Sequence, residues 1–123
     1  MPQAPVAELW IKINLPGHGQ VGPGKIDLLR MIHEHESISG AARAMKMSYR
    51  RAWLLVAALN KQFERPLVAT WAGGKSRGGA SLTKLGEKLI ENYDQVLEQA
   101  SRVNRALLTE IGRSTSRASN DEA

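Results

Sequence analysis

The apolar residues of this 123-residue chain change their spacing along its length, and the changes predict short strands and longer helices. Over residues 7–14 apolar and polar residues alternate, which is the pattern of a strand with one buried face. Over residues 23–35 apolar residues recur every three or four positions, which indicates an amphipathic helix. Between them, residues 16–20 are rich in turn-forming types and interrupt both patterns.

Residues 38–63 are predicted to form two helices joined by a tight turn. Ser39 is placed to cap a short first helix, about residues 40–46, whose alanines let another helix approach closely. Ser48 is placed to cap a second helix, about residues 49–64. Met47 stands in the turn, where a helical pair of this kind usually has glycine. The second helix has apolar residues at helical spacing at Ala52, Leu55, Val56, Leu59 and Phe63.

Pro66 cannot continue a helix, and a β-hairpin is predicted after it. Residues 67–71 and 80–82 are short strand candidates. The loop between them, residues 72–79, carries four glycines and two basic residues. Glycines let a backbone approach a phosphate ridge closely, so the hairpin is a candidate for nucleic-acid contact.

Residues 83–111 are predicted to form one continuous helix that begins at a Thr83 cap and ends at Gly112. At about 1.5 Å per residue it would be roughly 43 Å long, which exceeds what one small domain can cover. Its apolar residues follow a near-heptad seam, so a second copy of the same helix is expected to cover the far half. The predicted dimerisation residues are Leu89, Tyr93, Val96, Ala100, Val103 and Leu107.

The order of these elements is strand, helix, helix-turn-helix, hairpin and long helix. We therefore expect a mainly α fold with a small β component: a winged helix-turn-helix with a long C-terminal dimerisation helix. One domain is expected over residues 7–111, including the dimerisation helix at about residues 83–111. The tail, residues 112–123, is polar and is expected to be disordered.

Charge is concentrated in the middle of the chain. The sequence has 17 basic and 12 acidic residues, a net charge of +5, yet residues 37–86 hold nine basic residues and one acidic residue. This distribution favours a polyanionic partner, with nucleic acid first and a membrane surface second. A solvated basic face without a partner is the alternative.

Specific residues follow from the geometry of a helix-turn-helix, whose second helix enters the major groove with its N-terminal residues. Arg50 points further than Arg51 from the apolar side of that helix, so Arg50 is expected to read a guanine and Arg51 to contact phosphate. The predicted DNA-binding residues are Ser39, Lys46, Ser48, Tyr49, Arg50, Arg51, Lys75 and Arg77.

The sequence offers no support for catalysis. It contains no cysteine, and two of its three histidines, His33 and His35, would diverge around a helix rather than share a metal. Gly74-Lys75-Ser76 loosely mimics a phosphate-binding loop, but the helix-breaking Arg77-Gly78-Gly79 follows it. No signal peptide and no apolar run long enough to span a membrane are visible. We expect a cytoplasmic protein that is not an enzyme and needs no cofactor.

The segments SISGAARAMKMSYRRAW and VATWAGGKSRGGASLTKLGEKLIENYD resemble the DNA-binding domain of ModE-type, molybdate-responsive transcriptional regulators. The resemblance covers about residues 9–108. It is most specific at Ser48-Tyr49 with Ala52-Trp53, in the GGK loop, and at Leu82-Thr83 with Gly86.

The resemblance implies a homodimer that forms through the first strand and the last helix and binds double-stranded DNA at a palindromic operator. It also implies that Trp53 packs rather than reads bases. Family members that sense molybdate carry ligand-binding modules after this domain. Only a short polar tail follows Ile111 here, so no molybdate binding is expected in this chain.

Two functions remain open at this stage. The first is a sequence-specific, dimeric transcriptional regulator. The second is an architectural protein that binds nucleic acid without sequence choice, or a partner that forms mixed dimers with a full-length regulator. A regulator should prefer its own operator over random DNA, typically by about 10³ or more.

Overall fold

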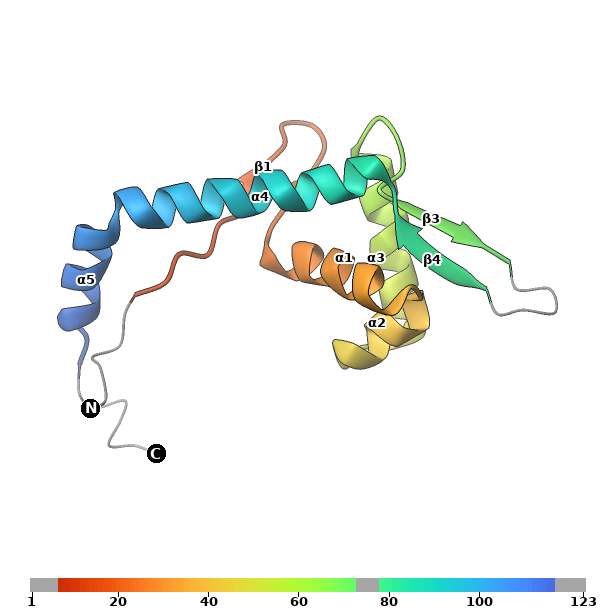
Figure 1. Ribbon diagram of the computed structural model, residues 1–123, viewed down its shortest axis with the longest axis horizontal. Coiled ribbons are helices and arrows are strands. Elements are labelled where there is room, and N and C mark those ends of the chain that lie inside the picture. Colours follow the sequence, from red (N-terminus) through yellow and green to blue (C-terminus); the bar gives the residue numbers. More distant parts are fainter. Residues whose placement is uncertain (1–6, 73–77, 117–123) are drawn as a thin grey trace. The chain divides into compact units, whose positions relative to one another are not determined.

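The computed structural model describes residues 7–72 and 78–116 of the chain and is mainly helical, as predicted (Figure 1). The chain divides into two compact units, Ile11–Tyr93 and Met1–Trp10 with Asp94–Ala123, where the sequence predicts one domain over residues 7–111. In chain order the elements are β1 (Ile13–Asn14), β2 (Gln20–Val21), α1 (Pro23–His35), α2 (Ile38–Ala44), α3 (Tyr49–Gln62), β3 (Val68–Trp71), β4 (Gly79–Leu82), α4 (Lys84–Val103) and α5 (Arg105–Arg113).

The unit Ile11–Tyr93 is built around one hydrophobic core, in which α1, α2 and α3 pack together with the base of the β3–β4 hairpin. The apolar stripes predicted for α1 and α3 are the buried sides of those helices. Ala41 and Ala42 are buried, which lets α2 lie close to its neighbours, whereas Ala44 is exposed. The buried core residues are Leu28, Leu29, Ile32, Ile38, Ala41, Ala42, Ala52, Val56, Leu59, Leu67, Val68 and Ala80.

The first strand is much shorter than predicted. Exposure alternates over residues 7–14 as expected, but within the described residues only Ile13 and Asn14 pair as a strand, with Val21 and Gln20. The turn between these strands needs two glycines, because Gly17 has φ +79° and Gly19 has φ +83°. Gln62, at the end of α3, holds the turn by donating from Nε2 to the His18 carbonyl at 2.7 Å.

The helix-turn-helix is confirmed as α2 and α3, with two corrections at its corners. Ser37, and not Ser39, caps α2, because its hydroxyl accepts from the Gly40 N–H at 2.7 Å. The helix accordingly runs from Ile38 to Ala44 rather than over residues 40–46. In the turn that follows, Lys46 has a left-handed backbone, with φ +56°.

The β3–β4 hairpin is the predicted wing, and Figure 1 shows its two strands running side by side away from the helices of this unit. Its root is tied to α3 by Asn60, whose Oδ1 accepts from Leu67 N at 2.9 Å and from Val68 N at 3.1 Å. The Ala80 N–H donates to the Glu36 carbonyl at 3.1 Å, which fastens β4 to the end of α1. The wing is therefore anchored to α3 through Asn60 and to the end of α1 through Glu36.

Thr83 caps α4 as predicted, since its hydroxyl accepts from the Gly86 N–H at 3.1 Å. The same hydroxyl donates to the Pro66 carbonyl at 2.8 Å, so the cap also joins α4 to the segment that enters β3. Helix α4 comes so close to that segment that a Cβ at Gly86 would collide with the Leu67 carbonyl oxygen. This contact explains why glycine stands at position 86.

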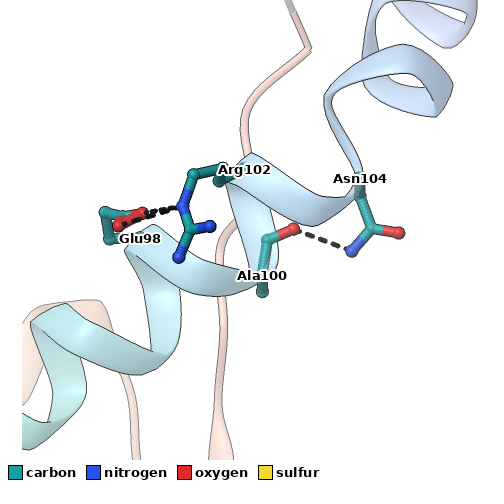
Figure 2. Close-up of polar contacts among 4 residues, drawn as sticks. All are labelled: Glu98, Ala100, Arg102 and Asn104. Carbon is teal, nitrogen blue, oxygen red and sulfur yellow. Dashed lines mark hydrogen bonds and ion pairs between the residues drawn. The ribbon is translucent and has the colours of Figure 1, made fainter.

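The single helix predicted over residues 83–111 is broken at Asn104, and this prediction was wrong. The Asn104 side chain donates from Nδ2 to the Ala100 carbonyl at 2.7 Å (Figure 2), and the Asn104 backbone N–H donates to the same carbonyl at 3.1 Å. Just before the break, Arg102 pairs with Glu98 at 3.0 Å. Helix α5 then continues through Gly112 to Arg113, so the first residues after 111 are helical, and residues 117–123 of the predicted tail lie outside the described part.

Glu36 gives a first prediction for stability, because it ends α1 with a left-handed backbone, φ +53°. Glu36→Gly should raise the free energy of unfolding by about 1 kcal/mol, since glycine adopts this conformation without the steric cost of a Cβ. Glu34→Gly, inside the same helix, should instead lower it by about 1 kcal/mol. Urea unfolding of both variants measures the difference, and equal shifts in one direction would contradict this account.

Candidate nucleic-acid interface

The N-terminal end of α3 presents polar and basic side chains to solvent. The Ser48 hydroxyl accepts from the Arg51 N–H at 3.1 Å, which confirms the predicted cap and fixes where the helix begins. Tyr49, Arg50 and Arg51, the three residues of the first turn, are all exposed. A helix that begins in this way offers its first turn to a partner while its other side stays in the core.

Arg50 lies almost opposite the buried side of α3. The residues of that side are Ala52, Val56 and Leu59, and successive residues of a helix are separated by about 100°. On that spacing Arg50 points directly away from the core, and Leu54, four residues later, follows it on the same outward line. Arg51 lies further round the helix, toward the side that is partly covered.

Two hollows flank the exposed part of α3. One, of about 300 Å³, is lined by Ser48, Arg50, Arg51, Leu54 and Leu55, so it is the basic side of the helix. The other, of about 380 Å³, lies between α3 and the wing. Its walls include Tyr49 and Trp53 from α3 and Trp71 from β3, so it is an aromatic groove.

The other predicted DNA contacts are distributed around this helix. Ser39 is exposed in the first turn of α2 and lines the aromatic groove. Lys46 is exposed in the turn that precedes α3. Lys75 and Arg77 lie outside the described residues, so their positions in the wing stay predictions.

The electrostatic setting of the interface is positive. Glu64 is the only acidic residue in positions 37–86, and it lies near the basic side chain of Arg65, with a closest approach of 3.6 Å. The exposed turns of α3 therefore have no acidic residue of their own helix beside them. This arrangement suits the approach of a phosphate backbone.

Sequence reasoning missed the groove itself. It treated Trp71 only as an apolar strand residue and Trp53 only as a packing residue, yet both side chains are 49% exposed. Trp71 pairs across the wing with Gly79, and its ring lies so close that a Cβ at Gly79 would collide with it. A tryptophan followed by a glycine-rich loop and strand was the available signal for this groove. Only the strand register shows that this tryptophan lies opposite a glycine.

The predicted dimerisation residues fall into two groups. Leu89 packs against the core, and Tyr93 is buried and donates from its hydroxyl to the Ile11 carbonyl at 2.7 Å. These two residues are thus engaged within the unit Ile11–Tyr93, and their assignment to a seam between copies stays a prediction. Val96, Val103 and Leu107 are exposed and Ala100 is half-buried, and all four belong to the other unit.

The fold and this interface define a class of protein. The family model of the bacterial regulatory helix-turn-helix proteins of the lysR family matches residues 24–87, from α1 to the first turn of α4. The chain belongs to this family of DNA-binding regulators.

Within that class, the chain resembles ModE proteins, as its sequence motifs predict. It is 40% identical over 83 residues to the molybdenum-pterin-binding protein MopA of Rhodobacter capsulatus, covering 68% of this chain and 31% of MopA. It is 38% identical over 87 residues to the transcriptional regulator ModE of Haemophilus influenzae, covering 71% of this chain and 34% of that regulator. The chain thus spans about a third of the length of these relatives.

A solved structure supports the winged fold. A mutant form of MepR from S. aureus superposes with a TM-score of 0.58 over 83% of this chain and 71% of that protein, at 15% sequence identity. At that identity the likeness concerns the fold alone. Among the described residues, no helix is long and apolar enough to cross a membrane, and no group of three or more potential metal ligands occurs.

Proposed function

We propose that this protein is a sequence-specific transcriptional regulator that binds a palindromic DNA operator as a homodimer. The observation that carries the proposal is the Ser48-capped start of α3, which directs Arg50 away from the core. A DNA-binding role in a bacterial family supports a cytoplasmic location, where the chromosome lies. No reaction is needed for this role, and no residue is assigned to catalysis.

Base reading is assigned to Arg50. Its guanidinium can donate two parallel hydrogen bonds to O6 and N7 of guanine in the major groove. Tyr49 and Ser48 lie beside it at the end of the helix that would enter the groove. Arg51, further round the helix, is assigned to phosphate, together with Lys46 and the predicted wing residues Lys75 and Arg77.

Dimerisation is assigned to the unit that contains the end of α4 and all of α5. Among its described residues, only Gly112 is buried, while Trp10, Val96, Val103, Leu107 and Ile111 expose between 46% and 81% of their surface. Short helices without a buried face are marginal in water, so this segment needs a partner. A second copy of the chain supplies an equally apolar surface, and its two-fold symmetry would present two α3 helices to two half-sites.

Two other roles, an architectural protein and a partner of a full-length regulator, would give different experimental results. An architectural protein would use the same basic surface without preferring any DNA sequence. A partner of a full-length regulator would dimerise with that regulator more readily than with itself. We assign no molybdate binding to the unit Ile11–Tyr93, because its interior is packed core and its exposed face is assigned to DNA.

Arginine substitutions test base reading once a preferred duplex has been selected from random DNA. Arg50→Ala should weaken binding to that duplex by about 1–3 kcal/mol and relax the preference at one base pair, because the bidentate contact is lost. Arg51→Ala should weaken selected and random DNA about equally and reduce the salt slope by about 0.9. Arg50→Lys, which keeps the charge, is the matched control and should lose the preference as well.

Repeated selection with the Arg50→Ala protein decides the assignment. A sequence logo of the selected duplexes that loses its preference at one position supports base reading by Arg50. Weaker binding with an unchanged logo would show that Arg50 contacts phosphate, and the assignment to base reading would be wrong.

A further inference from the structure

The aromatic groove has a feature that base reading by Arg50 does not use. Trp53 and Trp71 face it from α3 and from the wing, and each exposes 49% of its surface. Large aromatic side chains are usually more covered than this, and two of them lining one groove are an unusual apolar surface. The groove also contains the hydroxyl-bearing residues Ser39 and Thr70.

The position of the Trp71 ring is determined by the fold. The ring lies over Gly79 on the neighbouring strand, at a distance that leaves no room for a Cβ there. The Asn60 contacts hold the root of β3 to α3. The two tryptophans are thus carried by elements joined through hydrogen bonds, and a partner can bind them without ordering them first.

The expected path of DNA over this surface indicates which part of the DNA would fill the aromatic groove. If the first turn of α3 lies in the major groove and the wing approaches the DNA beside it, one sugar–phosphate strand must pass between helix and wing. The groove lies between those two elements. The surrounding segment, residues 37–86, carries nine basic residues and one acidic residue, so its charge complements a polyanion.

We infer that the aromatic groove seats one sugar–phosphate strand of the operator, with the rings of Trp53 and Trp71 packed against deoxyribose. Ser39 is placed to donate a hydroxyl hydrogen bond to a phosphate oxygen of the same strand. This inference rests on the proposed DNA-binding function and adds to it a contact that carries no charge. The contact contributes affinity on any sequence, whereas Arg50 contributes preference.

Alanine substitutions at the two tryptophans test the inference in the full-length chain. Trp53→Ala and Trp71→Ala should each weaken binding about tenfold, on selected and random duplexes alike, because buried tryptophan is a frequent source of interface affinity. The slope of log K against log salt should stay unchanged, since no phosphate charge contact is lost. Arg51→Ala, which should reduce that slope, is the matched comparison.

The outcomes separate this inference from the function on which it rests. A wild-type protein that binds all duplexes equally would contradict sequence-specific regulation, while the effect of the tryptophan variants on those duplexes would still be measured. If both variants bound DNA within about twofold of wild type, the inference that the groove binds a sugar–phosphate strand would be wrong. Loss of preference at a single base pair would mean that the rings contact bases, which also overturns it.

A second measurement does not depend on alanine variants that could disturb the wing. Proteins that keep one tryptophan, with phenylalanine at the other two positions, report the access of acrylamide to that ring. The selected duplex should shield Trp53 and Trp71 from acrylamide. If acrylamide still reached both rings in the DNA complex, the inference would be wrong. The groove would then be available to another ligand, such as a small aromatic molecule.

Discussion

Gly86→Ala should lower the free energy of unfolding by about 3 kcal/mol, although alanine is normally the better helix former. The added Cβ would collide with the Leu67 carbonyl oxygen and lie 3.2 Å from the Leu67 carbonyl carbon. Leu67 is fully buried, and its carbonyl already accepts from the Thr83 N–H at 2.9 Å. Neither the strand nor the helix can move away without breaking the junction between the wing and α4.

Gly24→Ala is the matched control, because Gly24 is also in a helix but a Cβ there would meet no atom within 4 Å. It should raise the free energy of unfolding by about 0.5–1 kcal/mol through the usual helix preference for alanine. Urea unfolding of the two variants gives the comparison. If Gly86→Ala were as stable as wild type, the close approach of α4 to Leu67 would not exist as described.

Charge in the exposed apolar segment should have the second large effect. The double variant Val96→Glu, Val103→Glu should sediment as a monomer of 13.5 kDa, whereas wild type should sediment as a dimer at micromolar concentration. Both valines are exposed within the chain, so the new charges should leave the unit Ile11–Tyr93 folded. Because two linked half-site contacts reinforce each other, loss of the dimer should weaken operator binding by about 10² or more.

Gln95→Glu is the control for this experiment. It adds a negative charge at an exposed position about 100° round α4 from Val96, away from the apolar side. It should remain dimeric and bind the operator nearly as well as wild type. A wild-type protein that is itself monomeric at micromolar concentration would contradict the homodimer.

The parts of the fold that depend on local sequence were predictable. Ser48 and Thr83 cap their helices as expected, because a hydroxyl one residue before the first helical residue can accept from a free N–H of the first turn. The two wing strands follow from Pro66 and the glycine loop. The candidate DNA-binding turn of α3 follows from its cap and from the apolar stripe on its opposite side.

The errors arose where tertiary contacts decide between local alternatives. Ser37 and Ser39 are both plausible caps, and burial of Ile38 as the first residue of α2 selects Ser37. Apolar spacing continues through Asn104 without interruption, so it gave no sign that the Asn104 side chain would bind the Ala100 carbonyl. The pairing of Trp71 with Gly79 depends on strand register, which composition does not specify.

The most direct test of sequence-specific regulation is the ratio of two dissociation constants, measured at one stated salt concentration. One is for the best duplex selected from random DNA, and the other is for a scrambled duplex of the same length and composition. The account predicts that the selected duplex binds tighter by about 10³ or more. A ratio below about ten at physiological salt would contradict it and would indicate non-specific nucleic-acid binding instead.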